Sequence, residues 1–252
     1  MSGTTREIVD WLNLQLEVER IKDNALNGLQ VEGKPDVRRV VTGVSANRAL
    51  IQAAIDQKAD LLVVHHGLFW SSPVAIAGPL RQRLKLLLEH DLSLAAYHLP
   101  LDLHPTLGNN SGLCKLLGLV DVVPFGIYKG QRIGFRGRLP QPAPLTAVVD
   151  RIRQGLQRDP TLLPGHQRPV STVAVCSGGA ADMVDQAIAE SCDLYLSGEL
   201  TEYSPAMAIE GAIDVVVAGH HATERFGVQS LATAIAQQFD VSVEFVDVPN
   251  PF

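Results

Sequence analysis

Histidines stand in two adjacent pairs in this chain, and each pair follows a short apolar run. His65-His66 comes after Leu61–Val64, and His220-His221 comes after Val215–Ala218. Random placement of eight histidines would give about 0.25 adjacent pairs, so two pairs at the ends of apolar runs depart from chance. A single histidine at a strand end is more often an ordinary hydrogen-bonding residue. Paired imidazoles at two such ends favour a metal site.

Two carboxylates extend this set. Glu224 lies four residues after His220, a spacing that puts both side chains on one face of a predicted helix over Ala222–Phe239. Asp102 ends the segment His98-Leu99-Pro100-Leu101-Asp102; taken alone, it is equally typical of a turn or cap. Imidazole and carboxylate ligands suit Fe, Zn, Mn, Co or Ni. Three histidines and two carboxylates exceed the need of one tetrahedral ion, and they suit two ions about 3.5–4 Å apart that share a carboxylate and activate water.

Several neighbouring groups are open to two interpretations. His98 is the imidazole least needed for ligation, so we expect it to act as a proton shuttle. The run Gly108–Ser111 is typical of a turn with a helix cap, although it could also cradle a phosphate. Arg225 suits either an anionic ligand or a surface salt bridge. His166 belongs to no such cluster and is predicted to lie on the surface. The absence of Gly-x-Ser-x-Gly and Walker sequences argues against a serine hydrolase or a P-loop enzyme.

The elements that must position these residues alternate between strands and helices. This alternation predicts an α/β fold with parallel strands, whose functional groups gather at the strand carboxyl ends. The predicted strands are Val37–Val44, Leu61–Val64, Leu92–Tyr97, Val173–Cys176, Asp193–Leu196 and Val215–Ala218. The predicted helices are Thr4–Arg20, Ala46–Gln57, Leu80–His90, Asn110–Leu117, Leu145–Leu156, Ala180–Ser191 and Ala222–Phe239, with Leu162–Pro169 as a loop.

The second half of the chain has the same order and spacing of elements as the first. In each half a strand, a helix, a second strand and a third strand follow one another, and the third strand ends at His98 or at Gly219-His220. The order predicts two similar, interlinked α/β lobes in one unit over residues 1–252. The expected metal site lies between them at the strand carboxyl ends. Lobe one is expected over 1–124 and lobe two over 125–252.

Composition restricts the classes of protein. The 252 residues are 46% hydrophobic and 19% charged, which excludes a disordered chain. The net charge of −6, without a basic run, makes duplex nucleic acid an improbable partner. Three dispersed cysteines are typical of buried thiols in a reducing compartment. The N-terminus lacks a secretory pattern and no apolar run reaches membrane-spanning length, so we expect no membrane association and a cytoplasmic protein.

At these residues the chain resembles the Nif-three-like family, also labelled GTP cyclohydrolase 1 type 2 homologues or dinuclear-metal-centre hexameric proteins. The resemblance extends from about Trp11 to Pro251, in the compact form without a large central insertion. The motifs that carry it are Asn27–Val31, Val64–Gly67, His98–Asp102, Gly108–Asn110 and Gly219–Arg225.

The resemblance implies a two-lobed α/β fold, a toroidal homohexamer and two divalent metal ions per subunit. Matched position by position, the implied ligands are His65, His66, Asp102, His220 and Glu224, with Glu224 as the bridge and His98 lining the site. Together with the residues themselves, it predicts a metal-dependent hydrolase of a small anionic substrate, nucleotide-like or otherwise phosphorylated or cyclic. The alternative is a non-catalytic metal-binding scaffold or metal chaperone.

Overall fold

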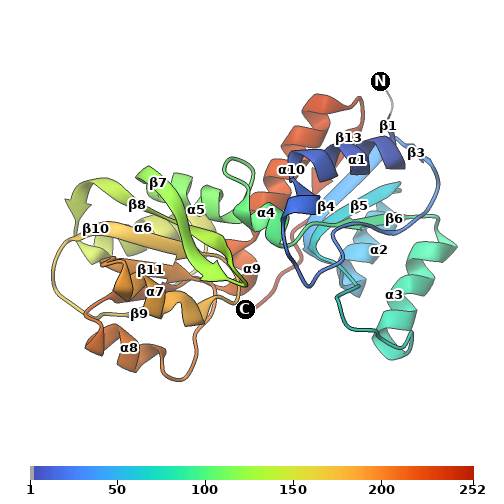
Figure 1. Cartoon of the computed structure of the whole chain (residues 1–252). Coiled ribbons are helices and arrows are strands. Elements are labelled where there is room, and N and C mark those ends of the chain that lie inside the picture. The colour runs from blue at the N-terminus through green and yellow to red at the C-terminus, as the bar shows by residue number, and fades with distance from the viewer. Residues whose placement is uncertain (1–2) are drawn as a thin grey trace. The chain divides into compact units, whose positions relative to one another are not determined.

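The computed structural model describes residues 3–252 and divides the chain into two compact units. Unit 1 comprises the residues up to Leu101 together with Gly227–Pro249. Unit 2 comprises Asp102–Phe226 together with Asn250–Phe252. The predicted α/β class is confirmed, because each unit is built on a mixed sheet with helices on both faces (Figure 1). Among the helices of residues 3–252, none combines the length and the apolar character of a membrane span.

The sheet of unit 1 has five strands, of which four are parallel. In sheet order they are β13 (Ser242–Phe245), β4 (Arg39–Ser45), β5 (Leu61–His66), β6 (Ser93–Ala96) and the antiparallel β2 (Gly28–Val31). Strands β1 (Gly3–Thr4) and β3 (Asp36–Val37) form a separate antiparallel pair. The three central strands are apolar on both faces, as expected for parallel strands covered on both sides.

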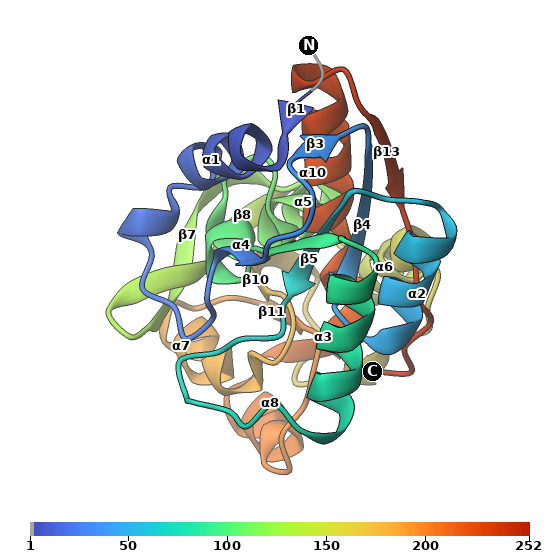
Figure 2. The ribbon, with the colours of Figure 1, turned by 90° about the vertical axis from the view of Figure 1, so that its right-hand side faces the viewer.

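Helices cover both faces of the unit 1 sheet. They are α1 (Thr5–Gln15), η1 (Val18–Arg20), α2 (Arg48–Asp56), α3 (Gly78–Glu89) and α10 (Arg225–Gln238). Helices α2 and α3 lie on one face, where Ile51 and Leu87 pack with Leu62 of β5. Helices α1 and α10 lie on the other face (Figures 1 and 2). Helix α1 begins at a capping box, in which Thr4 and Glu7 bond to each other's backbone N–H groups.

Unit 2 contains a six-stranded sheet. In sheet order its strands are β7 (Val120–Tyr128), β8 (Gln131–Ala143), β10 (Val170–Cys176), β11 (Leu194–Ser197), β12 (Asp214–Val217) and β9 (Thr161–Leu163). Strands β10, β11 and β12 are parallel, and the other pairings are antiparallel.

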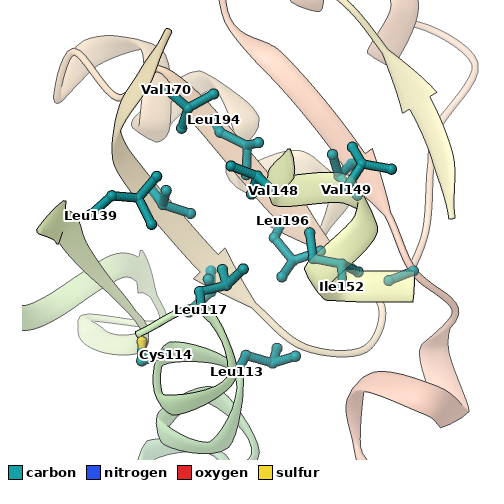
Figure 3. Packing of buried hydrophobic residues seen from close by; sticks show 14 of the residues in the cluster. Leu113, Cys114, Leu117, Leu139, Val148, Val149, Ile152, Val170, Leu194 and Leu196 are labelled. Atoms are coloured by element: carbon teal, nitrogen blue, oxygen red, sulfur yellow. The ribbon is translucent and has the colours of Figure 1, made fainter. Parts of the chain in front are cut away.

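Two helices bury the main core of unit 2 against one face of this sheet. Leu113 and Leu117 of α5 (Asn109–Leu117) and Ile152 of α6 (Leu145–Leu156) pack with Leu194 and Leu196 of β11 (Figure 3). The other helical elements are α4 (Leu99–Leu103), which crosses the boundary of the units, η2 (Ala181–Met183), α7 (Val184–Ala189), α8 (Ser204–Glu210) and α9 (His220–Thr223).

The two units repeat the same arrangement of strands. Three parallel strands stand in chain order in each, β4-β5-β6 and β10-β11-β12, and a strand from earlier in the sequence, β2 or β9, lies antiparallel beside the third. This shared order agrees with the predicted repeat. In both cases a short helix follows the third strand, and the longer helix after it belongs to the other unit. Helix α5 comes after β6 and α4 but packs in unit 2, and α10 comes after β12 and α9 but lies mostly in unit 1.

Several predicted elements differ from the structure. The helix predicted over Thr4–Arg20 ends at Gln15, and the one predicted over Ala180–Ser191 is a 3₁₀ turn followed by α7. The loop predicted over Leu162–Pro169 is wrong at its start, because β9 extends to Leu163 and pairs with β12. The helix predicted over Ala222–Phe239 is interrupted at Glu224, which separates α9 from α10.

Candidate metal centre

Three histidines of unit 1 converge at the carboxyl ends of two neighbouring strands. His65 and His66 end β5, and His98 follows β6. The ring centroid of His65 lies 4.5 Å from that of His66 and 5.1 Å from that of His98. One nitrogen of each ring lies within 4.8 Å of the others, as three ligands of one ion require. The parallel strand ends thus bring these three histidines of unit 1 together.

Each of these rings is oriented through its Nδ1 atom. His65 is fully buried, and its Nδ1–H donates to the carbonyl oxygen of Tyr97 at 2.8 Å. His66 Nδ1 lies 3.0 Å from the hydroxyl of Ser45, which ends the neighbouring strand β4. His98 Nδ1 lies 3.0 Å from a carboxylate oxygen of Asp23. A neutral histidine held in this way presents the lone pair of Nε2, which is the common arrangement of metal-binding imidazoles.

Asp23 holds His98 from a segment that sequence reasoning did not single out. Its carboxylate also accepts from the backbone N–H of Leu99 at 2.9 Å, and the side-chain amide oxygen of Asn27 accepts from the N–H of His98 at 2.7 Å. Burial alone would raise the pKa of Asp23. The His98 hydrogen bond and charge, with the Asn27 and Ala25 hydrogen bonds, reverse this and hold that pKa well below its usual range. Asp23 is therefore a fixed anion behind His98.

Asp102 of unit 2 is fixed by two hydrogen bonds to one of its oxygens. Its Oδ1 accepts from the amide of Asn109 at 2.8 Å and from the hydroxyl of Ser177 at 3.1 Å. Asn110 links the same elements, because its amide oxygen accepts from the N–H of Ser177. Asn109 and Asn110 thus contact this carboxylate and its surroundings, a role that neither interpretation of Gly108–Ser111 included.

His220 and Glu224 form a second pair of candidate ligands in unit 2. His220 Nε2 lies 3.1 Å from Glu224 Oε1, as the four-residue spacing predicted, and Glu224 is buried. His220 Nδ1 lies 2.5 Å from the carboxylate of Glu199, which follows β11. Burial lowers the pKa of His220, but the hydrogen bonds and charges of Glu224 and Glu199 outweigh it and raise that pKa to about 9. The two carboxylates therefore create surroundings for His220 that favour positive charge.

Two carboxylates of unit 2, those of Asp102 and Glu224, lie near the end of β10. Burial raises the pKa of the Cys176 thiol, and the negative charges of Asp102 and Glu224 raise it further. Two residues along the chain, Gly178 adopts φ +64°, and a Cβ atom added there would lie 2.2 Å from Glu224 Oε1. Glycine suits both this positive φ and the present position of the carboxylate.

The repeat also relates the candidate ligands of the two units. His98 and His220 each follow the third parallel strand, and each precedes a carboxylate, Asp102 or Glu224, by four residues. The second strand of each triplet ends differently: in His65-His66 in unit 1, and in Ser197 followed by Glu199 in unit 2. The halves therefore share a framework of ligand positions, but the second strand supplies two imidazoles in one unit and an orienting carboxylate in the other.

Three further polar residues make contacts that stabilise the fold: His104, Arg225 and His166. His104 Nδ1 accepts from the backbone N–H of Leu107, which places it in a turn. Arg225 donates to the carbonyl oxygen of Leu156 at the end of α6. The prediction that His166 lies on the surface is wrong, because its side chain is 5% exposed and its Nε2–H donates to the carbonyl oxygen of Asp193.

Comparison with known proteins gives consistent matches over nearly the whole chain. The family model described as Duf34/NIF3 (NGG1p interacting factor 3) matches residues 3–251. A protein of Pseudomonas aeruginosa named GTP cyclohydrolase 1 type 2 homolog is 43% identical over 245 residues, covering 97% of each chain. A protein of the same name from Neisseria meningitidis serogroup B is 44% identical over 247 residues, covering 98% of each.

Two solved structures are also similar to this chain. One described as protein ybgI of unknown function has a TM-score of 0.94 at 38% identity. The protein TTHA1606 from Thermus thermophilus has a TM-score of 0.89 at 37% identity. Both matches cover the full length of both chains.

Proposed function

The chain belongs to the Duf34/NIF3 family, and from that premise we propose that it is a metal-dependent hydrolase of small anionic substrates. Its ligands would be His65, His66, Asp102, His220 and Glu224, holding two divalent ions with Glu224 shared between them. His98 would move a proton. The proposal also includes a homohexamer, as the resemblance of the sequence implies, and a cytoplasmic location.

The observation that carries the proposal is the orientation of the donors. Four of the five proposed ligands have a second polar atom held by a neighbour: His65 by Tyr97, His66 by Ser45, Asp102 by Asn109 and Ser177, and His220 by Glu199. Metal-binding residues are characteristically fixed by such outer contacts, which set the ring tautomer and reduce the entropy lost on binding. The donors are all nitrogen or oxygen, so the set fits Fe, Zn, Mn, Co or Ni and leaves the choice among them open.

The chemistry divides between the ions and the side chains. Divalent ions, when bound, supply Lewis acidity that lowers the pKa of water and polarises the bond to be broken. His98 would accept or donate a proton at Nε2, because Asp23 holds its Nδ1 and fixes the orientation of the ring. The net charge of −6 disfavours polyanions and leaves small anions as the substrate class.

The hydrolase is tested by metal loading and turnover together. Protein purified anaerobically and saturated with each candidate metal is analysed for metal content and screened for phosphatase, phosphodiesterase and cyclohydrolase activity. We expect about two ions per chain and turnover that tracks metal content. Glu224→Ala should lose both ions and turnover, whereas His90→Ala, in an exposed histidine at the end of α3, should change neither. A saturated stoichiometry of one would contradict the dinuclear site.

The orientation of the ligands equally suits a protein that binds metal without catalysis, and this alternative predicts a different result. A metal chaperone or scaffold would show no turnover across the screen and would transfer its metal stoichiometrically to an acceptor protein or a chromophoric chelator.

Light scattering tests the assembly separately. A mass of about six chains is expected, and a monomer at micromolar concentration would contradict the hexamer.

A further inference from the structure

Trp70 leaves 41% of its surface exposed beside the histidines of unit 1. Its ring centroid lies 5.0 Å from that of His98, with the ring planes at 75°, and 6.3 Å from that of His66. Tryptophan offers the largest apolar and π surface of any side chain. Here that surface adjoins two imidazoles of the candidate metal centre and remains open to solvent.

The backbone that carries Trp70 is held on both sides. Leu26 N–H donates to the carbonyl oxygen of Phe69 at 3.1 Å, Ser71 N–H donates to that of Asn24 at 2.5 Å, and Ala25 forms a β-bridge with Trp70. The indole therefore projects from a fixed base.

Gln30 and Gly67 complete this attachment. The side-chain oxygen of Gln30 accepts from the N–H groups of Leu68 at 2.7 Å and Phe69 at 3.3 Å. A Cβ atom at Gly67 would lie 2.3 Å from that same oxygen, so the approach requires glycine. A rigid aromatic surface loses little conformational entropy when a ligand covers it.

One segment, Asp23–Gln30, fixes both Trp70 and His98. Asp23 and Asn27 hold the ring and the backbone of His98, while Ala25, Leu26 and Gln30 hold the chain on either side of Trp70. The distance between the indole and the imidazole is thus set by a single short stretch of chain. Such a shared support suits two groups that act on one ligand.

We propose that Trp70 is the stacking wall of a subsite for a planar heteroaromatic ring, such as a nucleobase, next to His66 and His98. Flat rings stack on exposed indoles, and the interaction tolerates different bases because each has a π face. The inference rests on the proposed function in one respect: it gives the small anionic substrate of that site a planar ring. Binding of the ring requires no turnover, and this separates the two hypotheses.

The two tryptophans of the chain make a direct test. Trp11 packs edge-on against Phe239, with ring centroids 5.6 Å apart, on the α1 side of unit 1. Trp11→Phe leaves Trp70 as the sole indole, and Trp70→Phe leaves Trp11. Each variant, freed of metal with a chelator, is titrated with guanosine 5′-monophosphate, adenosine 5′-monophosphate and the ring-free control ribose 5-phosphate. We expect saturable quenching of Trp70 emission by both nucleotides and none by ribose 5-phosphate, with Trp11 emission unchanged.

Calorimetry with guanosine 5′-monophosphate supplies the second measurement. Trp70→Ala should weaken binding about tenfold, and Trp70→Phe should recover most of the loss, since a phenyl ring still stacks. Circular dichroism establishes that both variants fold. Unchanged Trp70 emission up to millimolar nucleotide, or wild-type affinity in Trp70→Ala, would overturn the subsite. Ring-dependent binding without metal-dependent turnover would leave the subsite standing and overturn the hydrolase. If the protein turns over only ring-free substrates, and Trp70→Ala does not change that turnover, the hydrolase would stand and the subsite would be overturned.

Discussion

Asp60 and Asp193 occupy equivalent positions in the two units and make the same hydrogen bonds. Each directly precedes the second strand of its parallel triplet, β5 or β11. Its Oδ2 accepts from two consecutive backbone N–H groups at or next to the first strand of that triplet, β4 or β10. These are Arg38 and Arg39 for Asp60, at 2.7 and 3.0 Å, and Ser171 and Thr172 for Asp193, at 3.0 and 2.9 Å. The backbone N–H of each aspartate also donates to the equivalent carbonyl oxygen, that of Arg39 or of Thr172. The repeat therefore extends to individual contacts.

These contacts make the stability of both units depend on pH in the same way. Burial raises the pKa of Asp60 and of Asp193. At Asp60, hydrogen bonds from Lys34 and from backbone N–H groups outweigh burial and lower the pKa. At Asp193, hydrogen bonds from backbone N–H groups and from Thr172 do the same. A carboxyl group whose pKa is lower in the folded state stabilises folding above its unfolded pKa of about 3.9, and this contribution is lost as the pH falls further.

Asp60→Asn and Asp193→Asn should therefore each lower the free energy of unfolding at pH 7 by about 1–3 kcal/mol. The deficit should already be smaller at about pH 3, because that pH lies below the unfolded pKa of about 3.9 and the contribution is lost as the pH falls further toward the folded pKa. Urea unfolding followed by circular dichroism at both pH values measures this. Asp240→Asn, in an exposed residue, serves as the control and should be nearly neutral. A deficit of the same size at both pH values would show that charge is not its cause.

The sequence singles out the candidate ligands because their signal is local. His65 and His66 end an apolar strand, and His220 and Glu224 are four residues apart on adjoining helical turns, so strand ends and helical spacing suffice to find them. The residues that orient the side chains of the candidate site lie far away in sequence: Asp23 is 75 residues from His98, and Ser177 is 75 from Asp102. No spacing rule connects such pairs, and they follow only from the folded chain.

The exchange of α5 and α10 was beyond sequence reasoning for a different reason. Apolar spacing shows that Leu113 and Leu117 share a buried face, but it does not show which sheet covers that face. Strand β13 was missed although its sequence, Ser-Val-Glu-Phe, alternates polar and apolar residues as an edge strand does. Its four residues are too few to stand out against the loop that follows α10.

Glu199 should strengthen metal binding without being a ligand. Its carboxylate holds His220 Nδ1 at 2.5 Å, and loss of such outer contacts commonly costs 10–100-fold in metal affinity. We expect Glu199→Gln to weaken Zn²⁺ binding within that range while the saturated stoichiometry stays at that of the wild type. Competition with a chromophoric chelator measures the affinity. Glu202→Gln, in an exposed neighbour, should bind as the wild type does; loss of a whole ion from Glu199→Gln would instead identify Glu199 as a ligand.

Gly178 allows a test of the space around Glu224. Gly178 and Gly130 both have positive φ, +64° and +80°, so alanine strains the backbone at either position by about 1 kcal/mol. They differ in surroundings: a Cβ atom at Gly178 meets Glu224 Oε1 and His220 Nε2, whereas nothing lies within 4 Å at Gly130. Gly178→Ala should therefore lose at least as much stability as Gly130→Ala, and only Gly178→Ala should bind metal at least tenfold more weakly. Equal metal affinity in the two variants would mean that Glu224 can move without cost to the ligand set.

The exchanged helices predict where a core mutation is felt. Leu231 of α10 and Leu113 of α5 are both fully buried, and removal of such a side chain costs about 2–5 kcal/mol. Leu113 belongs to the first half of the chain but packs with β10 and β11 of unit 2 (Figure 3), whereas Leu231 belongs to the second half and lies in unit 1.

We therefore expect Leu113→Ala to accelerate amide hydrogen exchange in β10, β11 and β12, and Leu231→Ala to accelerate it in β4, β5 and β6. Amides protected by opening of one unit respond to the stability of that unit, so mass spectrometry of peptides from each strand resolves the two effects. Leu14→Ala, in a side chain that is 74% exposed on α1, is the control and should alter neither set. If each substitution instead loosened the strands of its own half of the sequence, the assignment of α5 and α10 to opposite units would be wrong. If both substitutions accelerated exchange equally in all six strands, the two units would unfold together as one cooperative body, and the expected separation of the two effects would be wrong.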